Sequence, residues 1–370
     1  MEAAFFVLLN LSFSLFIACH KLHNITVSIF RKKIKKEVLV SVNIPVFNSE
    51  KTLRMALDSV ACQDFENLEI ILISDASTGT DENNNSFRQI AKKFFREHKI
   101  PHTVIEHSSN LGILETRREC VTKSCGKYIV SLDSDDVFES PHSISRLYEA
   151  AEKNECDILE FGARIVVRDS SARTDILETM EKIVAPKPDQ SFAGSKIVHE
   201  LLVKKTFGSY LWTKMIKKSV YESALSCIPF TECTMAEDFL IFVLCCVFAK
   251  KLTLLNETHY VYSFFNGVTN VKKIESEVDL VKWARICSSA SVYSILSMFI
   301  KDNPGCFSEE SANAVRESCL ASLGKLIEIM HRTITDDGLR TSARKILCDY
   351  WGSDFVGKVE RQWIETRSKK

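Results

Sequence analysis

Three carboxylates occur within four residues of the sequence, in the run Asp133-Ser134-Asp135-Asp136. This run directly follows residues 128–132, an apolar segment that predicts a buried β-strand. If the strand continues, the alternation of its side chains places Asp133 and Asp135 on the same side. Carboxylate oxygens suit Mg²⁺, Mn²⁺ or Ca²⁺, so the pattern indicates a divalent cation site at these two residues. Taken alone, an Asp-rich turn is the simpler interpretation.

Polar residues also follow two other predicted strands. Phe47-Asn48 comes after residues 38–46, and Ser74-Asp75-Ala76-Ser77 comes after residues 70–73. In an open α/β sheet, ligands bind beyond the carboxyl ends of the strands. These residues are therefore candidates for the same binding site as the acidic run.

The elements that would position them alternate between strand and helix. Short apolar runs predict strands at 38–46, 70–73, 103–105, 128–132 and 157–167. Helical spacing of apolar residues predicts helices at 53–61, 87–95, 114–123 and 144–151. This order predicts an α/β domain with a mostly parallel sheet flanked by helices. Beyond about residue 271 the pattern is helical.

Composition limits the possible classes of protein. The 370 residues carry 48 Lys and Arg against 48 Asp and Glu, and 45% of the residues are hydrophobic. A disordered chain has fewer apolar residues and more net charge. A nucleic-acid-binding protein that relies on overall charge would have an excess of basic residues, so no nucleic-acid partner is expected.

The first 36 residues predict a membrane anchor and a basic linker. Residues 3–19 carry no charge and are mostly apolar, close to the shortest length that spans a bilayer. A cleaved signal peptide begins with positive charge, whereas Met1-Glu2 carries a negative charge. A cleaved signal peptide and a buried core helix are the two alternatives to an anchor. Five basic residues at 31–36 follow. The expected localisation is a single-pass protein of an endomembrane or the cell membrane, with the side of the main domain left open.

Several segments, in order along residues 40–265, resemble the glycosyltransferase family 2, which has the GT-A fold. Residues 42–48, 57–63 and 73–78 are similar to its V-I-I-P-V-Y-N, S-I-x-x-Q and V-D-D-G-S-T-D motifs. Residues 126–136 are similar to G-E-Y-I-x-F-L-D-S-D-D. The motif N-x-G-x-x-x-A-R-N is similar to residues 110–117, and W-N-K-L to residues 211–215. The motif G-E-D is similar to residues 236–238, and the closing Y-x-Y segment to residues 259–262.

The resemblance implies an inverting glycosyltransferase that uses a nucleotide sugar, most plausibly a UDP-sugar, and Mn²⁺ or Mg²⁺. Asp133 is expected to reach the ribose or the metal, and Asp135 to bind the cation that bridges the diphosphate. Asp238 is expected to be the general base, with Glu237 beside it. The residues expected to bind the nucleotide sugar are Pro45, Phe47, Asn48, Asp75, Ser77, Gly112, Arg117, Asp133, Ser134 and Asp135. Trp212 and Lys214 are expected on the acceptor side, facing a glycan, lipid or protein acceptor.

This chain also departs from the family pattern. Ser74 and Ala76 replace the usual Asp and Gly, and Thr116 and Arg118 replace Ala and Asn. An inactive GT-A module that serves as a membrane-tethered binding or scaffold protein is therefore the alternative function. The expected domains are 1–36 for the anchor and linker, 37–270 for the GT-A domain and 271–370 for a helical region.

Overall fold

The fold is described here for residues 27–31, 37–168, 174–231, 233–264 and 274–368 of a computed structural model. The expected membrane anchor at residues 3–19 lies outside these residues.

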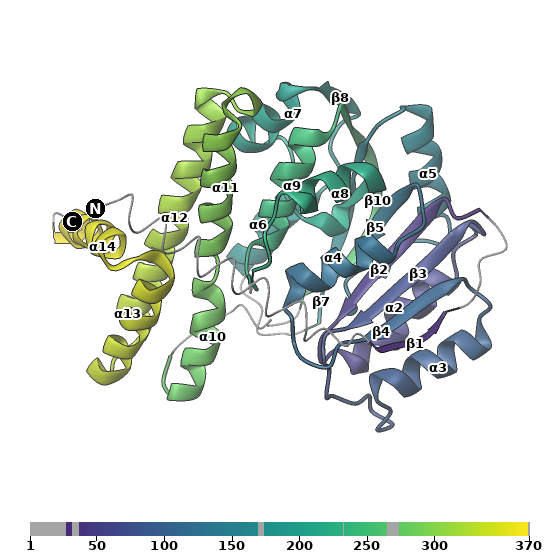
Figure 1. The fold of residues 1–370 in the computed structure, drawn as a ribbon, viewed down its shortest axis with the longest axis horizontal. Coiled ribbons are helices and arrows are strands. Elements are labelled where there is room, and N and C mark those ends of the chain that lie inside the picture. The colour runs from purple at the N-terminus through teal and green to yellow at the C-terminus, as the bar shows by residue number, and fades with distance from the viewer. Residues whose placement is uncertain (1–26, 32–36, 169–173, 232, 265–273, 369–370) are drawn as a thin grey trace.

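A ten-stranded sheet forms the centre of the described residues (Figure 1). Its order is β1-β4-β3-β2-β5-β9-β7-β10-β6, and β8 pairs with β10. The strands are β1 (Val27–Arg31), β2 (Val40–Val46), β3 (Leu68–Ser74), β4 (His102–Glu106), β5 (Tyr128–Ser131), β6 (Val137–Phe138), β7 (Ile158–Val167), β8 (Gln190–Ala193), β9 (Lys214–Lys217) and β10 (Lys251–Phe264).

The sheet is mixed, with six of these ten strands running in one direction. Strands β2, β3, β4 and β5 pair in parallel. Strand β9 is antiparallel to both β5 and β7, so β7 and its parallel neighbour β10 run in the same direction as β5. Every residue of β2, β3 and β5 is buried, which explains why these strands read as continuous apolar runs. The predicted parallel arrangement is confirmed for the first half of the sheet.

Helices follow the strands as the periodicity predicts. The four helices predicted from the sequence each bury apolar residues, such as Leu53, Ala56, Leu57 and Val60 of the first. The helices before residue 250 are α2 (Glu50–Ala61), α3 (Phe87–Glu97), α4 (Ile113–Lys123), α5 (Ser143–Lys153), α6 (Thr174–Val184), α7 (Ser195–His199), α8 (Lys218–Ser226) and α9 (Glu237–Phe248).

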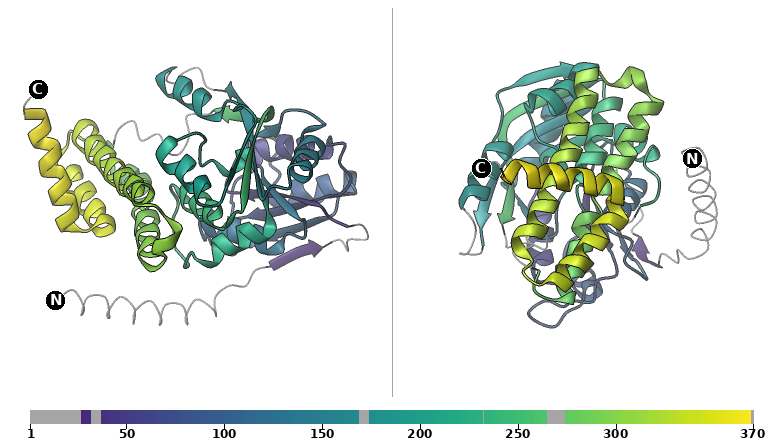
Figure 2. Two further views of the ribbon diagram at one scale, coloured as in Figure 1. Left: turned by 90° about the horizontal axis from the view of Figure 1, so that it is seen from above. Right: turned by 90° about the vertical axis from the view of Figure 1, so that its left-hand side faces the viewer.

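The region after residue 274 is helical and packs on the sheet domain (Figure 2). Its α-helices are α10 (Glu277–Cys287), α11 (Ala290–Asp302), α12 (Glu309–Thr333), α13 (Asp337–Trp351) and α14 (Ser353–Ser368). One hydrophobic core joins Phe242 of α9 to Trp283, Leu326 and Leu347 of these helices. The C-terminal helices therefore complete the core of the sheet domain.

One stretch of the described residues, Glu277–Asp302, is long and apolar enough to cross a membrane. It covers α10 and α11, and 56% of its most apolar window is buried inside the protein. Trp283 in this stretch is fully buried and donates a hydrogen bond to the carbonyl oxygen of Ala343 at 2.9 Å. This burial accounts for the apolar character of the stretch through packing within the fold.

Candidate active site

A cavity of about 250 Å³ opens at the carboxyl ends of β2 and β3. Three structural units surround it: the ends of these strands, the start of α4 with the loop before α9, and α10. The residues that line it are Pro45, Val46, Phe47, Asp75, Asn110, Gly112, Ile113, Thr116, Thr234, Met235, Lys282, Arg285 and Ile286. The structure therefore brings Pro45, Phe47, Asp75 and Gly112 together, as expected for residues that share one ligand.

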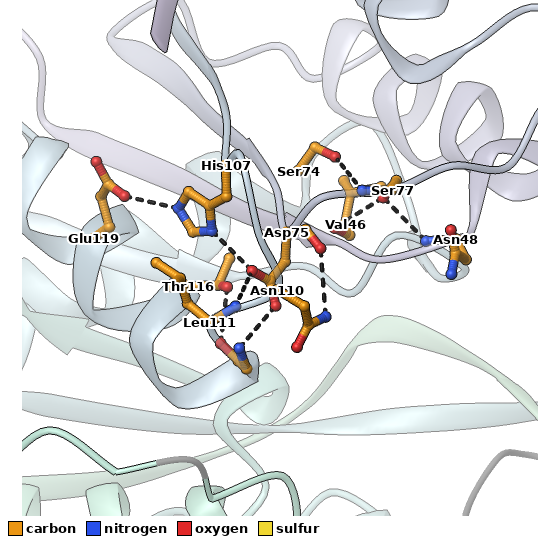
Figure 3. Close-up of polar contacts among 11 residues, drawn as sticks. Val46, Asn48, Ser74, Asp75, Ser77, His107, Asn110, Leu111, Thr116 and Glu119 are labelled. Atoms are coloured by element: carbon orange, nitrogen blue, oxygen red, sulfur yellow. Dashed lines mark hydrogen bonds and ion pairs between the residues drawn. The ribbon is translucent and has the colours of Figure 1, made fainter. Parts of the chain in front are cut away.

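Asp75 is held by the residues that precede helix α4 (Figure 3). Its Oδ1 accepts a hydrogen bond from the backbone N–H of Leu111 at 2.7 Å, and its Oδ2 accepts one from that of Gly112 at 2.9 Å. Gly112 has φ 88°, a conformation that glycine adopts without strain. The start of a helix carries partial positive charge, so this position stabilises the Asp75 carboxylate.

His107 is a site residue that the sequence analysis missed. Its ring is buried, with Nδ1 2.8 Å from Asp75 Oδ1 and Nε2 2.8 Å from Glu119 Oε2 (Figure 3). Burial acts to lower the pKa of His107, but the hydrogen bonds to Asp75 and Glu119 outweigh it and raise the pKa to about 9. His107 directly follows β4, so the rule of searching strand ends could have found it.

The turn after β2 interlocks with the turn after β3. The backbone N–H of Asn48 donates to Ser77 Oγ at 3.0 Å, and Asn48 Oδ1 accepts from the N–H of Thr78 at 2.9 Å. Asn48 and Ala76 both have left-handed backbones, with φ of 52° and 57°. In the structure, Asn48 and Ser77 therefore shape the cavity edge by fixing these two turns against each other.

Arg117 gathers three of the expected site carboxylates, the two catalytic acids and one cation ligand. This buried side chain lies with Nη2 3.2 Å from Asp133 Oδ1, Nη2 3.7 Å from Asp238 Oδ1 and Nε 3.7 Å from Glu237 Oε1. The three acids come from the end of β5 and the first turn of α9, more than a hundred residues apart. The structure thus brings the acidic run and the G-E-D-like segment into one site.

Burial and neighbouring charges shift the pKa values of the two acids at the start of α9. Burial raises the pKa of Glu237, the charge of Asp238 raises it further, and Arg117 opposes both. Burial likewise raises the pKa of Asp238, again opposed by Arg117. Asp238 Oδ1 is buried and accepts no hydrogen bond among the described residues. This oxygen is chemically suited to take a proton from a substrate hydroxyl.

The acidic run contains two buried residues with structural hydrogen bonds, Ser134 and Asp136, and two half-buried acids, Asp133 and Asp135. Asp136 is fully buried, and it accepts hydrogen bonds from Tyr260 Oη at 2.8 Å and the backbone N–H of Ser263 at 2.6 Å. Tyr260 Oη in turn accepts a hydrogen bond from the N–H of Asp133 at 3.1 Å. Ser134 is buried, with its hydroxyl 2.6 Å from that of Ser49. Asp136 and Ser134 therefore anchor the turn that carries the other two acids.

Asp133 and Asp135 have the chemistry of a divalent cation site. Burial, followed by the charge of Asp133, raises the pKa of Asp135 to about 6, and a cation would relieve both effects. The described residues contain no group of three or more His, Cys, Asp or Glu side chains arranged to hold a metal. Two carboxylates fit Mg²⁺-type binding, in which substrate phosphates and water supply the other ligands.

Trp212 and Lys214, expected on the acceptor side, lie in the core. Trp212 is 3% exposed and stacks on Tyr260 and Tyr262 with ring centroids 4.9 and 5.0 Å away. Lys214 is 1% exposed and forms an ion pair with Glu160 at 3.0 Å. This placement favours a packing role over the expected contact with an acceptor.

Helix α10 forms one wall of the cavity, which the sequence analysis did not anticipate. Its Lys282 and Arg285 line the cavity and are exposed. Within the described part of the chain, neither side chain has an ion-pair partner, so both cations are available to a ligand. Thr234 of the opposite wall donates its backbone N–H to Ser288 Oγ at 3.1 Å and so fastens the residues that follow α10.

The strand order and the helices that flank the sheet define a GT-A-like α/β fold with a cavity at the strand ends. Residues 41–214 match the model of glycosyl transferase family 2, so this part of the sheet domain is similar to that family.

The comparisons with individual proteins agree with this class. An uncharacterized glycosyltransferase, EpsJ of Bacillus subtilis, is 28% identical over 225 residues, which cover 60% of each chain. A poly(ribitol-phosphate) beta-glucosyltransferase of Bacillus spizizenii is 29% identical over 226 residues, covering 60% of this chain and 32% of that protein. The matches thus span about 60% or less of these relatives. The structure of S. aureus TarS 1–349 with UDP-GlcNAc has a TM-score of 0.50 at 18% identity, covering 89% of this chain and 92% of TarS 1–349, and shows the shared fold.

Proposed function

We propose that this chain is a metal-dependent inverting glycosyltransferase. It transfers a sugar from a nucleotide sugar, with a UDP-sugar as the first candidate, to a hydroxyl of a glycan, lipid or protein. The observation that carries the proposal is the convergence of Asp133, Glu237 and Asp238 on Arg117, beside a cavity that contains Asp75 and Phe47.

The cavity and the acids suit the two ends of such a donor. Phe47 is 43% exposed at the cavity and offers an aromatic face on which a base can stack. Asp75 offers a carboxylate to the hydrogen-bond donors of the base. Asp133 and Asp135 would hold the cation, which stabilises negative charge on the leaving diphosphate as a Lewis acid.

The proposed reaction is a single displacement. The acceptor oxygen attacks the anomeric carbon as the bond from that carbon to the diphosphate oxygen breaks, which inverts the anomeric centre. Asp238 takes the proton of the acceptor hydroxyl at Oδ1, which accepts no hydrogen bond among the described residues and lies 3.7 Å from Arg117 Nη2. Arg117 keeps Asp238 and Glu237 close together by offsetting their repulsion.

The fold neighbour guides the choice of donor. TarS shares the fold, and its structure contains UDP-GlcNAc, which is a property of TarS. A panel of UDP-, GDP- and dTDP-sugars tests the proposal in the full chain, purified in detergent and supplied with Mn²⁺. Release of a nucleoside diphosphate is the measurement.

The panel is run with two variants. Asp238→Asn should lower turnover by at least about a hundredfold and leave donor binding within a fewfold of wild type, because it removes the base alone. Asp64→Asn alters an exposed acid that pairs with His142 and should leave turnover unchanged. If the wild type binds a donor but does not turn it over, the result supports the inactive module instead. If the wild type neither binds nor turns over any donor of the panel, the proposal is refuted.

The proposal includes a membrane tether at residues 3–19, for which the support is the uncharged apolar sequence followed by basic residues. Its test is fractionation of cells that express the full chain. The chain should remain in the membrane pellet at alkaline pH, and replacing Leu8, Leu9 and Leu11 with Asp should release it. An unchanged distribution of this variant would contradict the tether.

A further inference from the structure

His107 occupies a hydrogen-bond acceptor position of Asp75, the carboxylate that lines the cavity among the described residues. We propose that His107 determines base specificity, because it leaves Asp75 able to accept one hydrogen bond from a uracil-type base but not two from guanine. This inference rests on the proposed use of a nucleotide sugar and specifies which nucleotide the site prefers.

The oxygen Oδ1 of Asp75 is fully used within the protein. It accepts from the N–H of Leu111 at 2.7 Å and from His107 Nδ1 at 2.8 Å (Figure 3). A carboxylate oxygen accepts about two hydrogen bonds, one at each lone pair. No acceptor position is left at Oδ1.

The oxygen Oδ2 has capacity for one more hydrogen bond. It accepts from the N–H of Gly112 at 2.9 Å, and no other donor to it occurs in the described residues. Asp75 lines the cavity, although its side chain is only 5% exposed. A ligand in the cavity is therefore met by a single remaining acceptor position on this carboxylate.

A single free acceptor position on Asp75 suits a base that offers one hydrogen-bond donor. Uracil and thymine present one ring N–H between two carbonyl groups, whereas guanine presents a ring N–H beside an amino group. Guanine pairs best with both oxygens of a carboxylate at once, which the occupied Oδ1 prevents. A donor group that finds no acceptor in a buried site is costly, so guanine is penalised.

Glu119 fixes the orientation of His107. Both ring nitrogens face carboxylate oxygens, so the ring donates from both only when it is doubly protonated. The ring is wedged between the two acids with 2% of its side chain exposed. Glu119 is itself 3.7 Å from Lys123, which places a third charge behind the histidine.

Two variants of equal shape isolate the effect. In His107→Asn, the side-chain amide nitrogen takes the place of Nδ1 and still donates to Asp75. In His107→Leu, a side chain of nearly the same shape donates nothing. Calorimetric titrations of UDP and GDP in the presence of Mn²⁺ then give the ratio of the two affinities for wild type and both variants.

Wild type should bind UDP at least about tenfold more tightly than GDP, which is the scale of one hydrogen bond to a charged group. His107→Leu should lower this ratio about tenfold, and His107→Asn should keep it within about threefold of wild type. An equal fall in both variants, or no fall in His107→Leu, would overturn the inference. Melting curves show whether each variant is folded.

If His107→Leu is unfolded, Glu119→Gln, at a partly exposed position, is the milder variant. Glu119→Gln should lower the ratio of UDP affinity to GDP affinity in part. A ratio equal to that of wild type would then overturn the inference.

His331→Asn is the matched control, since it alters a histidine paired with a carboxylate, Glu360, in the C-terminal helices. It should leave the ratio unchanged. If wild type binds neither UDP nor GDP, the proposed function itself fails. Binding of both with a ratio that does not depend on position 107 refutes only the role of His107.

Discussion

Arg117 is the residue on which the charge balance of the site depends. It is buried beside Asp133, Glu237 and Asp238, and its positive charge offsets their mutual repulsion. Removing one partner of a buried ion pair leaves the other charge unpaired in a poorly solvated environment. Here three acids would be left together.

Arg117→Met should therefore lower the free energy of unfolding at pH 7 by about 3–5 kcal/mol. The loss should shrink as the pH falls, because Glu237 and Asp238 have raised pKa values and become neutral before ordinary carboxyls do. Urea unfolding at several pH values measures it. Arg164→Met, which breaks an exposed pair with Glu139, should cost less than about 1 kcal/mol, and equal losses in the two variants would contradict the account.

His107 adds a pH dependence of its own. Its pKa is raised from 6.5 to about 9 by Asp75 and Glu119, with burial opposing. A raised pKa contributes stability that is complete below pH 6.5 and is lost as the pH rises through about 9. Lys123, 3.7 Å from Glu119, is a further charged group at this cluster.

The stability difference between wild type and His107→Asn should thus be largest near pH 6 and fall by roughly 3 kcal/mol between pH 6 and pH 10. Urea unfolding across this range is the measurement, with His331→Asn as the control for general alkaline effects. A difference that stays constant with pH would show that His107 is uncharged in the folded protein.

Two turns carry alanine where the related family uses glycine. Ala76, after β3, and Ala236, before α9, have φ of 57° and 64°, in the left-handed region that L-residues other than glycine avoid. These turns present Asp75 and Glu237 to the site. The backbone strain is therefore located beside the functional side chains.

Ala76→Gly and Ala236→Gly should each stabilise the fold by about 0.5–1 kcal/mol, since relief of roughly 1–2 kcal/mol exceeds the greater freedom of glycine in the unfolded chain. Thermal unfolding measures the gain. Ala150→Gly, within helix α5, should do the opposite and cost about 1 kcal/mol. Destabilisation by both turn substitutions would contradict the strain.

Helix α10 lines the cavity and would extend the proposed donor site beyond the sheet domain. Lys282 and Arg285 lie one helical turn apart at the cavity and are unpaired among the described residues. A donor with a diphosphate is attracted by such charges. The C-terminal helices are in this way tied to the proposed activity.

Replacing both Lys282 and Arg285 with alanine should raise the KM for the donor about fivefold and change kcat by less than twofold. At high salt the wild-type KM should approach that of the variant, because exposed charges are screened. Steady-state kinetics at two salt concentrations test this. Arg316→Ala, on the exposed face of α12, serves as the control, and a variant KM equal to wild type at low salt would contradict the role of α10.

At the scale of the whole molecule, one hydrophobic core spans the second half of the sheet domain and the C-terminal helices. Its members include Trp283, Leu326 and Leu347, all fully or nearly fully buried. Trp351 closes the packing by donating from Nε1 to the carbonyl oxygen of Cys287 at 3.1 Å. The orientation of α10 over the cavity follows from this shared packing.

The sequence predicted the first half of the fold well because its strands are buried on both faces and its helices have regular apolar stripes. Leu68 and Ser74 extend β3 beyond the predicted 70–73, since the pairing with β2 covers both residues. The antiparallel insertion of β9 between β5 and β7 could not be predicted, because long-range pairing leaves no local pattern.

The site residues fall into those that position along the chain could predict and those that depend on tertiary packing. Asp75 and Asp133 follow strand ends and could be found by position, and His107 obeys the same rule. The wall formed by Lys282 and Arg285 depends on how α10 docks, which spacing along the chain does not encode. Trp212 and Lys214 are polar or aromatic in sequence, but their partners Tyr260 and Glu160, which hold them in the core, come from distant strands.

The most direct test of the account is the effect of Mn²⁺ on UDP affinity, measured by calorimetry on the full chain. Mn²⁺ should tighten UDP binding by at least about tenfold in wild type, because in the proposed site Asp133 and Asp135 would hold the cation and its charge would offset that of the diphosphate. Asp135→Asn should abolish most of this gain, whereas Asp64→Asn should retain it. UDP binding that is equally tight with Mn²⁺ and with a chelator, or an undiminished gain in Asp135→Asn, would contradict the proposed site.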